Sequence, residues 1–409
     1  MILGMSRSGA LSRRIGMGKH QIIVLGGGYT GIVAAGRLAR RVRADEASVT
    51  LVTANATRDE RMRWHQLAAG QRYPLLPIAD ALKGSGARLE VARVERIDLA
   101  QHAVLTAGGP VLHYDSLVIA LGSVIDFGAV PGAREHAHGL TDVATVSAAA
   151  RTLDALPDRA RVVVVGGGLT GIEIATEVAE SHPRLQVAMA SSHTPGHWLS
   201  ESARRHLEGV FDRLGIEQIT GRVVRIERDA VVMAGGHDVP SAFTFWAGGF
   251  RANPLVASSG LEADELGRAH VDATLRAVSH PDVWVIGDAA RVPGPDGAPL
   301  KMGCRTGAFM ALAAPGKIAE ELAGGAATPF AGRYFAECIS LGRGDALLQW
   351  LTPEGTATDR IVTGRAARFM KEYVHRGNLF VARHPGPYAP VRRARVHAGA
   401  GSRRETIEA

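Results

Sequence analysis

Two glycine-rich segments have the residue types and spacing that bind a phosphate-containing cofactor. In the first, Gly26, Gly28 and Gly31 form a G-x-G-x-x-G pattern between an apolar run at 21–25 and a helix-like segment at 32–41. A strand, a tight turn and a helix in this order aim backbone N–H groups and the positive end of the helix at a pyrophosphate. The first glycine permits the turn, the second lets phosphate approach the backbone, and the third lets helix and strand pack closely. One copy of the pattern is weak evidence for a dinucleotide site.

The second segment repeats the first in the same context. Gly166, Gly168 and Gly171 stand between a strand-like run at 161–165 and a helix-like segment at 172–181. Both copies end in Thr-Gly-Ile. Tight turns that bind no nucleotide are the alternative, and the repetition makes this alternative the weaker one. The sequence therefore predicts two dinucleotide-binding domains in one chain.

A carboxylate at the end of an apolar run is a third candidate binding group. The run 283–286 is followed by Gly287 and Asp288. This carboxylate could accept a hydrogen bond from a sugar or ribityl hydroxyl, or it could cap the helix that follows. Two further runs, 116–122 and 243–249, end in Gly, which suits backbone that passes close to a ligand.

Side chains that could take part in redox or proton chemistry are few. Cys304 and Cys338 are the only cysteines, and their spacing fits neither a disulfide framework nor a zinc site. A buried, unreactive thiol at a helix start is the simpler interpretation of Cys304. His65 could titrate at a site, but a structural role is simpler for one His without an identified partner.

The elements that must position these groups belong to a chain of 409 residues, longer than one α/β core usually needs. No apolar run is long enough to cross a bilayer, and residues 1–20 lack the apolar centre of a secretory signal. The net charge of +7 is concentrated at the ends, since residues 360–409 hold eleven Lys or Arg against three Glu. Such segments are most often simply solvated, so we expect no nucleic-acid function.

Taken in order, five motifs resemble those of the two-dinucleotide-binding flavoprotein superfamily, and within it the type II NADH dehydrogenase-like family of NAD(P)H:acceptor oxidoreductases. The motifs are the two glycine turns and the segments 114–122 (YDSLVIALG), 246–249 (WAGG) and 286–288 (IGD). The resemblance covers residues 20–376. It implies an α/β fold with two Rossmann-like dinucleotide-binding domains, the NAD(P)-type domain inserted into the FAD domain, plus a C-terminal α+β segment. The expected boundaries are a disordered arm at 1–16, the FAD domain at 17–125 and 260–328, the NAD(P)-type domain at 126–259, the C-terminal segment at 329–384 and a flexible basic tail at 385–409.

By the same resemblance, the first turn holds FAD, Asp288 binds its ribityl chain, and the second turn receives NAD(P)H. The candidate catalytic residues are Cys304, Arg305 and Glu173; Arg305 could stabilise reduced flavin, an ordinary ion pair being its plainer role. Residues 61–67 resemble the family helix near the flavin. The expected cofactor contacts are Gly26, Gly28, Tyr29, Thr30, Gly31, Asn55, Val94, Ala120, Gly122, Gly287 and Asp288, with Gly166, Gly168, Leu169, Thr170, Gly171 and Gly249.

The sequence departs from the family pattern in three places. No C-x₄-C pair follows the first turn, which excludes the branch that relays electrons through thiols. The strands after the two turns end at Asn55 and at 191–193 (SSH), and neither carries the acid that often binds ribose. At the second site no acid would repel a 2′-phosphate, so NADPH is as plausible as NADH. The alternative is that the nicotinamide site has been lost. The segment 304–309 lacks both glutamines of a family pattern associated with quinone, which weighs against quinone as the acceptor.

These observations predict an FAD-dependent oxidoreductase that passes hydride from NAD(P)H through FAD to a quinone-like or other small conjugated acceptor. One alternative is a flavoenzyme that oxidises or reduces a specialised metabolite directly, and another is a flavin-binding redox sensor. The expected cofactors are FAD and NAD(P)H, with no metal. Residues 360–376 are expected to form an amphipathic helix that either docks weakly on a membrane, as in the resembled family, or packs on the protein's own core. We expect a cytoplasmic protein or one at the membrane periphery, with a homodimer as an open option.

Overall fold

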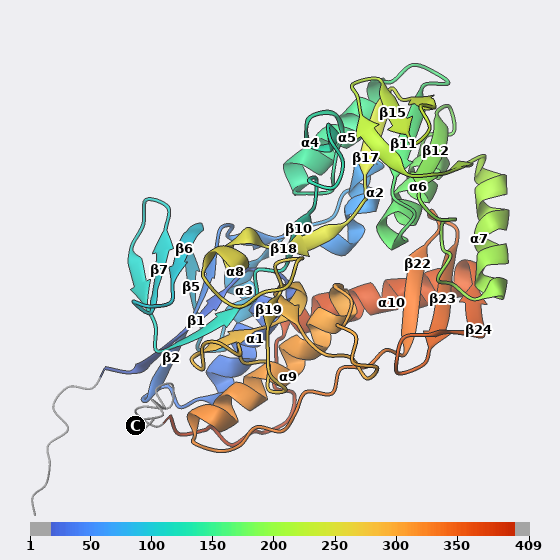
Figure 1. The fold of residues 1–409 in the computed structure, drawn as a ribbon. Coiled ribbons are helices and arrows are strands. Elements are labelled where there is room, and N and C mark those ends of the chain that lie inside the picture. Colours follow the sequence, from blue (N-terminus) through green and yellow to red (C-terminus); the bar gives the residue numbers. More distant parts are fainter. Residues whose placement is uncertain (1–17, 397–409) are drawn as a thin grey trace, which may run out of the picture.

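The computed structural model describes residues 18–396. The expected arm at 1–16 and the last part of the expected tail, 397–409, lie outside the described residues. Two lobes are joined through a narrow middle, and a long C-terminal helix runs from beneath the second lobe toward the first (Figure 1). The described part contains no helix that is both long and apolar enough to cross a membrane.

The first domain is built on a five-stranded parallel sheet in the order β20-β9-β1-β2-β5. Its centre is β1 (His20–Leu25), whose last four residues are apolar and buried, as expected of a strand inside a parallel sheet. Helices α1 (Tyr29–Arg41) and α9 (Cys304–Leu322) pack side by side on the sheet (Figure 1). The other strands of the sheet are β2 (Ala47–Thr53), β5 (Arg88–Val91), β9 (Ser116–Ile119) and β20 (Val283–Val285).

The second domain repeats this plan with four parallel strands in the order β13-β12-β11-β17. Its central strand is β11 (Arg161–Val165), and α6 (Leu169–Ser181) follows it directly. The remaining strands and helices are β12 (Gln186–Ser191), β13 (Glu217–Thr220), β17 (Phe243–Trp246), α4 (Ala133–His136), α5 (Val143–Ala155) and α7 (Glu201–Leu214), with an antiparallel sheet of β14 (Val223–Ile226), β15 (Ala230–Met233) and β16 (Asp238–Pro240).

The chain crosses between the domains twice, and the two crossings pair with each other. β10 (Ser123–Ile125) leads into the second domain, β18 (Phe250–Ala252) leads out of it, and the two are antiparallel neighbours. The second domain is thus inserted between β9 and β20 of the first sheet, which confirms the predicted fold class (Figure 1).

Short elements complete the first domain around the strand ends. They are β3 (Thr57–Arg58), η1 (Arg61–Arg63), α2 (Trp64–Ala68), β4 (Leu76–Pro77), α3 (Ile78–Leu82), β6 (Val94–Asp98), β7 (Ala103–Thr106), β8 (Val111–His113), α8 (Pro254–Ser258), β19 (Ala269–His270), η2 (Gly287–Ala289) and β21 (Ala290–Arg291).

The C-terminal segment is an antiparallel sheet followed by a helix. The strands are β22 (Ala336–Ser340), β23 (Ala346–Leu351) and β24 (Ala357–Thr363), and α10 (Gly364–Arg383) comes next. The helix expected at 360–376 therefore begins four residues later and ends seven later. Its first expected residues, including the β-branched pair Ile361 and Val362, extend β24 against β23 instead.

Residues 385–396, which are part of the basic tail expected to be flexible, make hydrogen bonds with α1. The guanidinium of Arg37 donates to the Pro385 carbonyl at 2.9 Å, and the Ala394 N–H donates to the Arg41 carbonyl at 2.7 Å. The segment covers the C-terminal part of α1, whose last carbonyls and buried Arg37 need partners. Composition alone does not reveal such a docking surface.

Candidate functional site

The first glycine turn is fixed by backbone packing at two positions and open at the third. Gly26 has φ +112°, and a Cβ there would lie 2.4 Å from the carbonyl oxygen of Ala120. A Cβ at Gly31 would lie 1.8 Å from the Gly26 oxygen. Gly28 instead is exposed and has no atom within 4 Å of its would-be Cβ. The turn therefore leaves open space at the N-terminus of α1, where a phosphate can approach backbone N–H groups.

The second turn has the same geometry. Gly166 has φ +120°, with a would-be Cβ 2.4 Å from the Ala247 oxygen, and a Cβ at Gly171 would lie 1.9 Å from the Gly166 oxygen. Gly168 is exposed with open space beside it. Neither α1 nor α6 has a side-chain cap or an acidic residue in its first turn. Both helix starts thus present N–H groups that an anion can satisfy.

Asp288 lies at the same edge of the first sheet as the first turn. Its carboxylate accepts hydrogen bonds from the Ser123 hydroxyl at 2.6 Å and from the Gly303 N–H at 2.8 Å. The second bond ties it to Gly303, the residue before α9, whereas Asp288 itself lies inside η2 and is the N-cap of neither helix. The neighbouring Gly287 packs against Thr30 of the first turn, which joins the turn to η2.

The remaining predicted contacts lie at strand ends or domain crossings. Asn55 follows β2, with its N–H 3.5 Å from the Thr53 hydroxyl, and Val94 begins β6 just after β5. The Gly122 carbonyl accepts from the Asn253 N–H, and the Gly249 carbonyl accepts from the Asp126 N–H, at the two crossings. These positions line the edge that an α/β sheet uses for ligands.

A buried cluster beside the first turn was missed by sequence reasoning. The guanidinium of Arg58, 4% exposed, stacks over the ring of Tyr29 at 3.7 Å and donates to Glu60 at 2.6 Å. The Tyr29 hydroxyl also donates to Glu60, at 2.8 Å. The cluster fixes Tyr29, the first side chain of α1. It also supplies the carboxylate of Glu60 near β2, a strand that does not end in an acidic residue. Only the clustering of charges in 58–61 hinted at it.

A charged cluster lies where α6, α2 and the C-terminal segment meet. Glu173, 6% exposed, accepts hydrogen bonds from the ammonium of Lys371 and, at 3.0 Å, from the Ser340 N–H. The imidazole Nδ1 of His65 lies 3.7 Å from the same carboxylate. Burial alone would raise the pKa of Glu173, but the Lys371 charge, with His65 and the two hydrogen bonds, outweighs it and lowers that pKa. Glu173 is therefore a buried carboxylate that stays ionised.

Two histidines in this cluster are held neutral. Burial lowers the pKa of His65 to about 4, although Glu173 opposes the shift. Burial and the Lys371 charge lower the pKa of His375 to about 3. Lys371 and His375 stand four residues apart on the buried face of α10. That spacing was the one signal by which the sequence could have indicated them, because Glu173 is far away along the chain.

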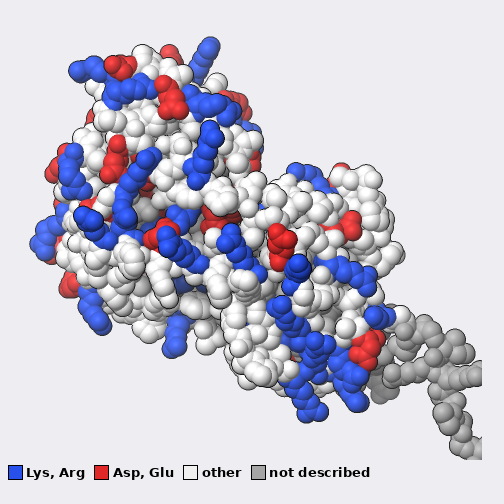
Figure 2. All heavy atoms as spheres, turned by 180° about the vertical axis from the view of Figure 1, so that it is seen from behind, with Lys and Arg blue, Asp and Glu red and all other residues white. Residues whose placement is uncertain are grey.

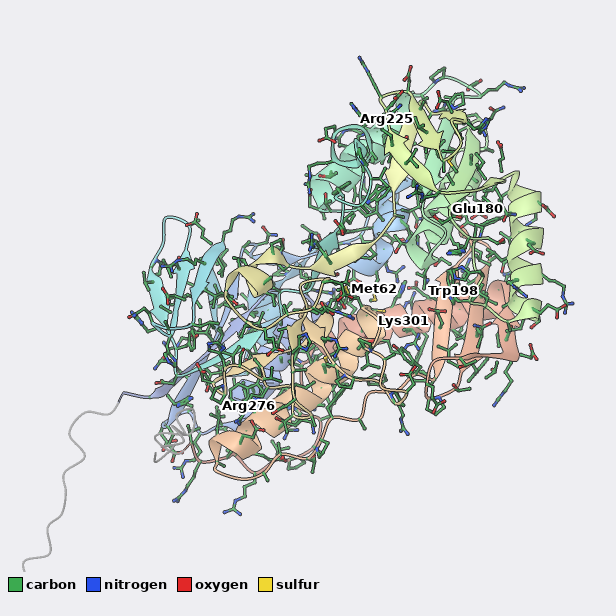
Figure 3. The ribbon with its side chains drawn as sticks, viewed as in Figure 1. Met62, Glu180, Trp198, Arg225, Arg276 and Lys301 are labelled. Atoms are coloured by element: carbon green, nitrogen blue, oxygen red, sulfur yellow. The ribbon has the colours of Figure 1, made fainter. Side chains whose placement is uncertain are left out.

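The candidate catalytic residues Cys304 and Arg305 begin α9, close to this cluster. Cys304 is exposed, yet desolvation by the surrounding protein raises the pKa of its thiol. The charges of Lys371, Arg305 and Glu173 all act on that pKa, so the three predicted catalytic residues share one region. Arg305 stacks over the ring of Phe335 at 5.4 Å. Figure 3 places Lys301, which precedes α9, and Met62 of η1 in the middle of the molecule, where the domains meet.

This arrangement can hold two dinucleotides at matching turns. The comparisons with known proteins agree with it. Residues 20–303 match the pyridine nucleotide-disulphide oxidoreductase family. An NADH dehydrogenase-like protein of Mycobacterium tuberculosis is 31% identical over 70% of this chain and 77% of its own length. A type II NADH:quinone oxidoreductase of Staphylococcus haemolyticus is 26% identical over 88% of this chain and 96% of its own length.

Two solved structures have the same fold at low sequence identity. A sulfide:quinone oxidoreductase from Aquifex aeolicus superposes with a TM-score of 0.76 at 22% identity, covering 90% of this chain and 93% of its own. NDH2 from Plasmodium falciparum, solved in complex with NADH, gives a TM-score of 0.74 at 13% identity, covering 89% of this chain and 97% of its own.

Proposed function

This chain belongs to the pyridine nucleotide-disulphide oxidoreductase family and is an FAD-dependent NAD(P)H oxidoreductase, and we propose that its electron acceptor is a quinone-like or other small conjugated molecule. FAD, when bound, takes two electrons from NAD(P)H and gives them to an acceptor. The protein's part is to bind both nucleotides, hold the acceptor near the flavin and manage protons.

The residues present fit both cofactors. We assign FAD to the first turn, with Gly28 leaving room for the diphosphate and Asp288 available to a ribityl hydroxyl. We assign the nicotinamide nucleotide to the second turn, around Gly168. The matching geometry of the two turns argues against the alternative in which the nicotinamide site has been lost.

The buried pair of Glu173 and Lys371 carries the proposal about the acceptor. Reduction of a quinone to a quinol takes up two protons as well as two electrons. Glu173 stays ionised through its contacts with Lys371 and Ser340, and its charge acts on the Cys304 thiol at the start of α9. The ammonium of Lys371 carries the proton of the pair and can give it to the acceptor, while the ionised Glu173 holds that ammonium in place.

Separate measurement of the two half-reactions tests this role. We expect Glu173→Gln to keep its FAD and to be reduced by NAD(P)H at nearly the wild-type rate. Reoxidation by a soluble quinone analogue should slow at least about tenfold, as expected when a proton donor loses the group that positions it. Glu208→Gln, an exposed acid on α7, is the matched control. Unchanged reoxidation in Glu173→Gln would refute the proton-transfer role.

A further inference from the structure

The loop that follows β12 lies directly against the second glycine turn. A Cβ on Gly167 would come within 2.7 Å of the Ser191 hydroxyl and 3.4 Å of the Pro195 Cα. The Ser191 hydroxyl donates to the His193 carbonyl at 2.6 Å, and the His197 N–H donates to the Thr194 carbonyl at 3.0 Å. These bonds fix the loop 192–197, so the side chains it carries have defined places beside the turn.

The first turn supplies an internal reference for this loop. There a Cβ on Gly27 would come within 2.3 Å of the Thr53 hydroxyl, and that hydroxyl lies 3.4 Å from the Asn55 carbonyl. Thr53 thus corresponds to Ser191, and Asn55 corresponds to His193. In dinucleotide-binding domains this strand end faces the adenosine ribose, and an acid here repels a 2′-phosphate. The first site has an amide at this position, and the second has an imidazole.

The side chains around His193 are hydrogen-bond donors without a competing acid. The rings of His193 and His197 lie 4.9 Å apart between centroids, and both residues are exposed. Ser192 and Thr194 are exposed as well, and residues 186–200 contain no Asp or Glu. Within residues 18–396 no side-chain hydrogen bond or ion pair engages either imidazole. Four polar side chains therefore stand free at the ribose end of the site.

Two neighbouring features add to this chemistry. The Gly221 N–H donates to the Ser191 carbonyl at 2.9 Å, which places the exposed Arg222 at the adjoining strand end. Trp198, which contacts the ring of His197, donates its indole N–H to Glu337 at 2.8 Å. Glu337 of β22 is the carboxylate of the C-terminal sheet near this loop, and the hydrogen bond with Trp198 already engages it. Figure 3 shows Trp198 where the second domain meets that sheet.

We propose that the loop 192–197, with Arg222, is a subsite for the 2′-phosphate of NADPH. The proposal rests on the assignment of the nicotinamide nucleotide to the second turn. Hydroxyl, imidazole and guanidinium donors suit a phosphate dianion, and a ribose hydroxyl does not need so many of them. NADPH should therefore bind more tightly than NADH.

Calorimetric binding of two nucleotide fragments to the FAD-loaded protein tests the subsite without turnover. We expect 2′,5′-ADP to bind at least about tenfold more tightly than 5′-AMP, which is about 1.4 kcal/mol. His193→Asn replaces the free imidazole with the amide that Asn55 provides at the first site, and it should remove most of that preference. Ser192→Glu should reverse the preference by repelling the phosphate. His237→Ala, an exposed histidine in the β15–β16 turn, is the matched control and should change neither affinity.

The outcomes separate this inference from the function on which it rests. Equal affinities for the two fragments in the wild type would overturn the subsite and leave the nicotinamide assignment standing. A preference for 2′,5′-ADP that His193→Asn and Ser192→Glu both retain would also overturn it. Binding of neither fragment to protein that carries FAD would refute the nicotinamide assignment itself. The flavin content of each variant shows whether it has folded.

Discussion

His65 shows how one residue links burial to pH dependence. Its imidazole is 3% exposed, and its Nε2 has no hydrogen-bond partner within the described residues. The unfolded chain protonates this His near pH 6.5, whereas the folded chain does so near pH 4. Between these values the unfolded state binds more protons, so folding stability decreases as the pH falls through this window.

We therefore expect the free energy of unfolding to decrease by about 2 kcal/mol between pH 7 and pH 5 through His65 alone. His375, with its pKa of about 3, adds to the decrease in the same direction. The lowered pKa of Glu173 acts at more acidic pH, where its carboxylate is finally protonated. Urea denaturation at both pH values should show a smaller decrease for His65→Asn than for the wild type. An equal decrease in both proteins would mean that His65 is not held neutral by burial.

At the scale of elements, the strand–turn–helix units make separate predictions for two glycines of one turn. Gly28 has an ordinary φ of −79° and open space beside it, so Gly28→Ala should fold. Its methyl group would occupy the space through which the diphosphate approaches, and we expect much weaker FAD binding. Gly31→Ala would place a methyl group 1.8 Å from a backbone oxygen and should destabilise the domain by more than about 4 kcal/mol.

Flavin content per chain and the Tm of the FAD-free proteins distinguish the two effects. Gly28→Ala should match the FAD-free wild type in Tm and differ from it in cofactor affinity. Gly31→Ala should have a far lower Tm or fail to fold. Equal behaviour of the two variants would contradict the assignment of one glycine to ligand approach and the other to packing.

Elements with strong local signals could be predicted from the sequence, and those defined by distant contacts could not. The β1 and β11 units combine apolar runs with glycine spacing, and both form where expected. The strand expected over 116–122 ends at Ile119 in β9, because the chain turns there past Gly26 toward the domain crossing. The helix expected from 360 begins at Gly364, because β24 finds its partner β23 in tertiary structure.

Some residues of the candidate site could likewise be predicted from short motifs, and others depend on distant contacts. Gly26, Gly28 and Asp288 belong to short motifs, so their place at one sheet edge could be inferred. Lys371 reaches Glu173 from α10, the last helix within residues 18–396, and no local pattern encodes a contact across 198 positions. The pairing of Arg58 with Tyr29 likewise depends on how β3 folds back against α1.

At the scale of the whole molecule, basic side chains and an exposed apolar stripe lie on the same C-terminal helix. In the view of Figure 2, Lys and Arg are spread over both lobes. On α10, Phe369 and Tyr373 are each 73% exposed, and four arginines accompany them: Arg365, Arg368, Arg376 and Arg383. Attraction to an anionic surface is screened within about 8 Å at physiological salt, and this short stripe buries little apolar area.

We therefore predict weak, salt-reversible binding to vesicles that contain phosphatidylglycerol, measured by co-sedimentation. The double change Phe369→Ser and Tyr373→Ser should remove most of the binding while all basic residues stay in place. Val111→Ser, an equally simple change at an exposed valine of β8, should leave it unchanged. Binding that persists at high salt in the double variant would show that α10 is not the contact surface.

The central claim is that two similar turns have different tasks, FAD at the first and NAD(P)H at the second. Anaerobic mixing of NADPH or NADH with wild type and with Gly168→Ala tests it most directly, because Gly168 has an ordinary φ of −77° and open space beside it. We predict that Gly168→Ala retains a full complement of FAD, and that its flavin absorbance bleaches at least about tenfold more slowly than in the wild type at subsaturating nucleotide. Bleaching of Gly168→Ala at the wild-type rate, or loss of its FAD, would contradict this division of tasks.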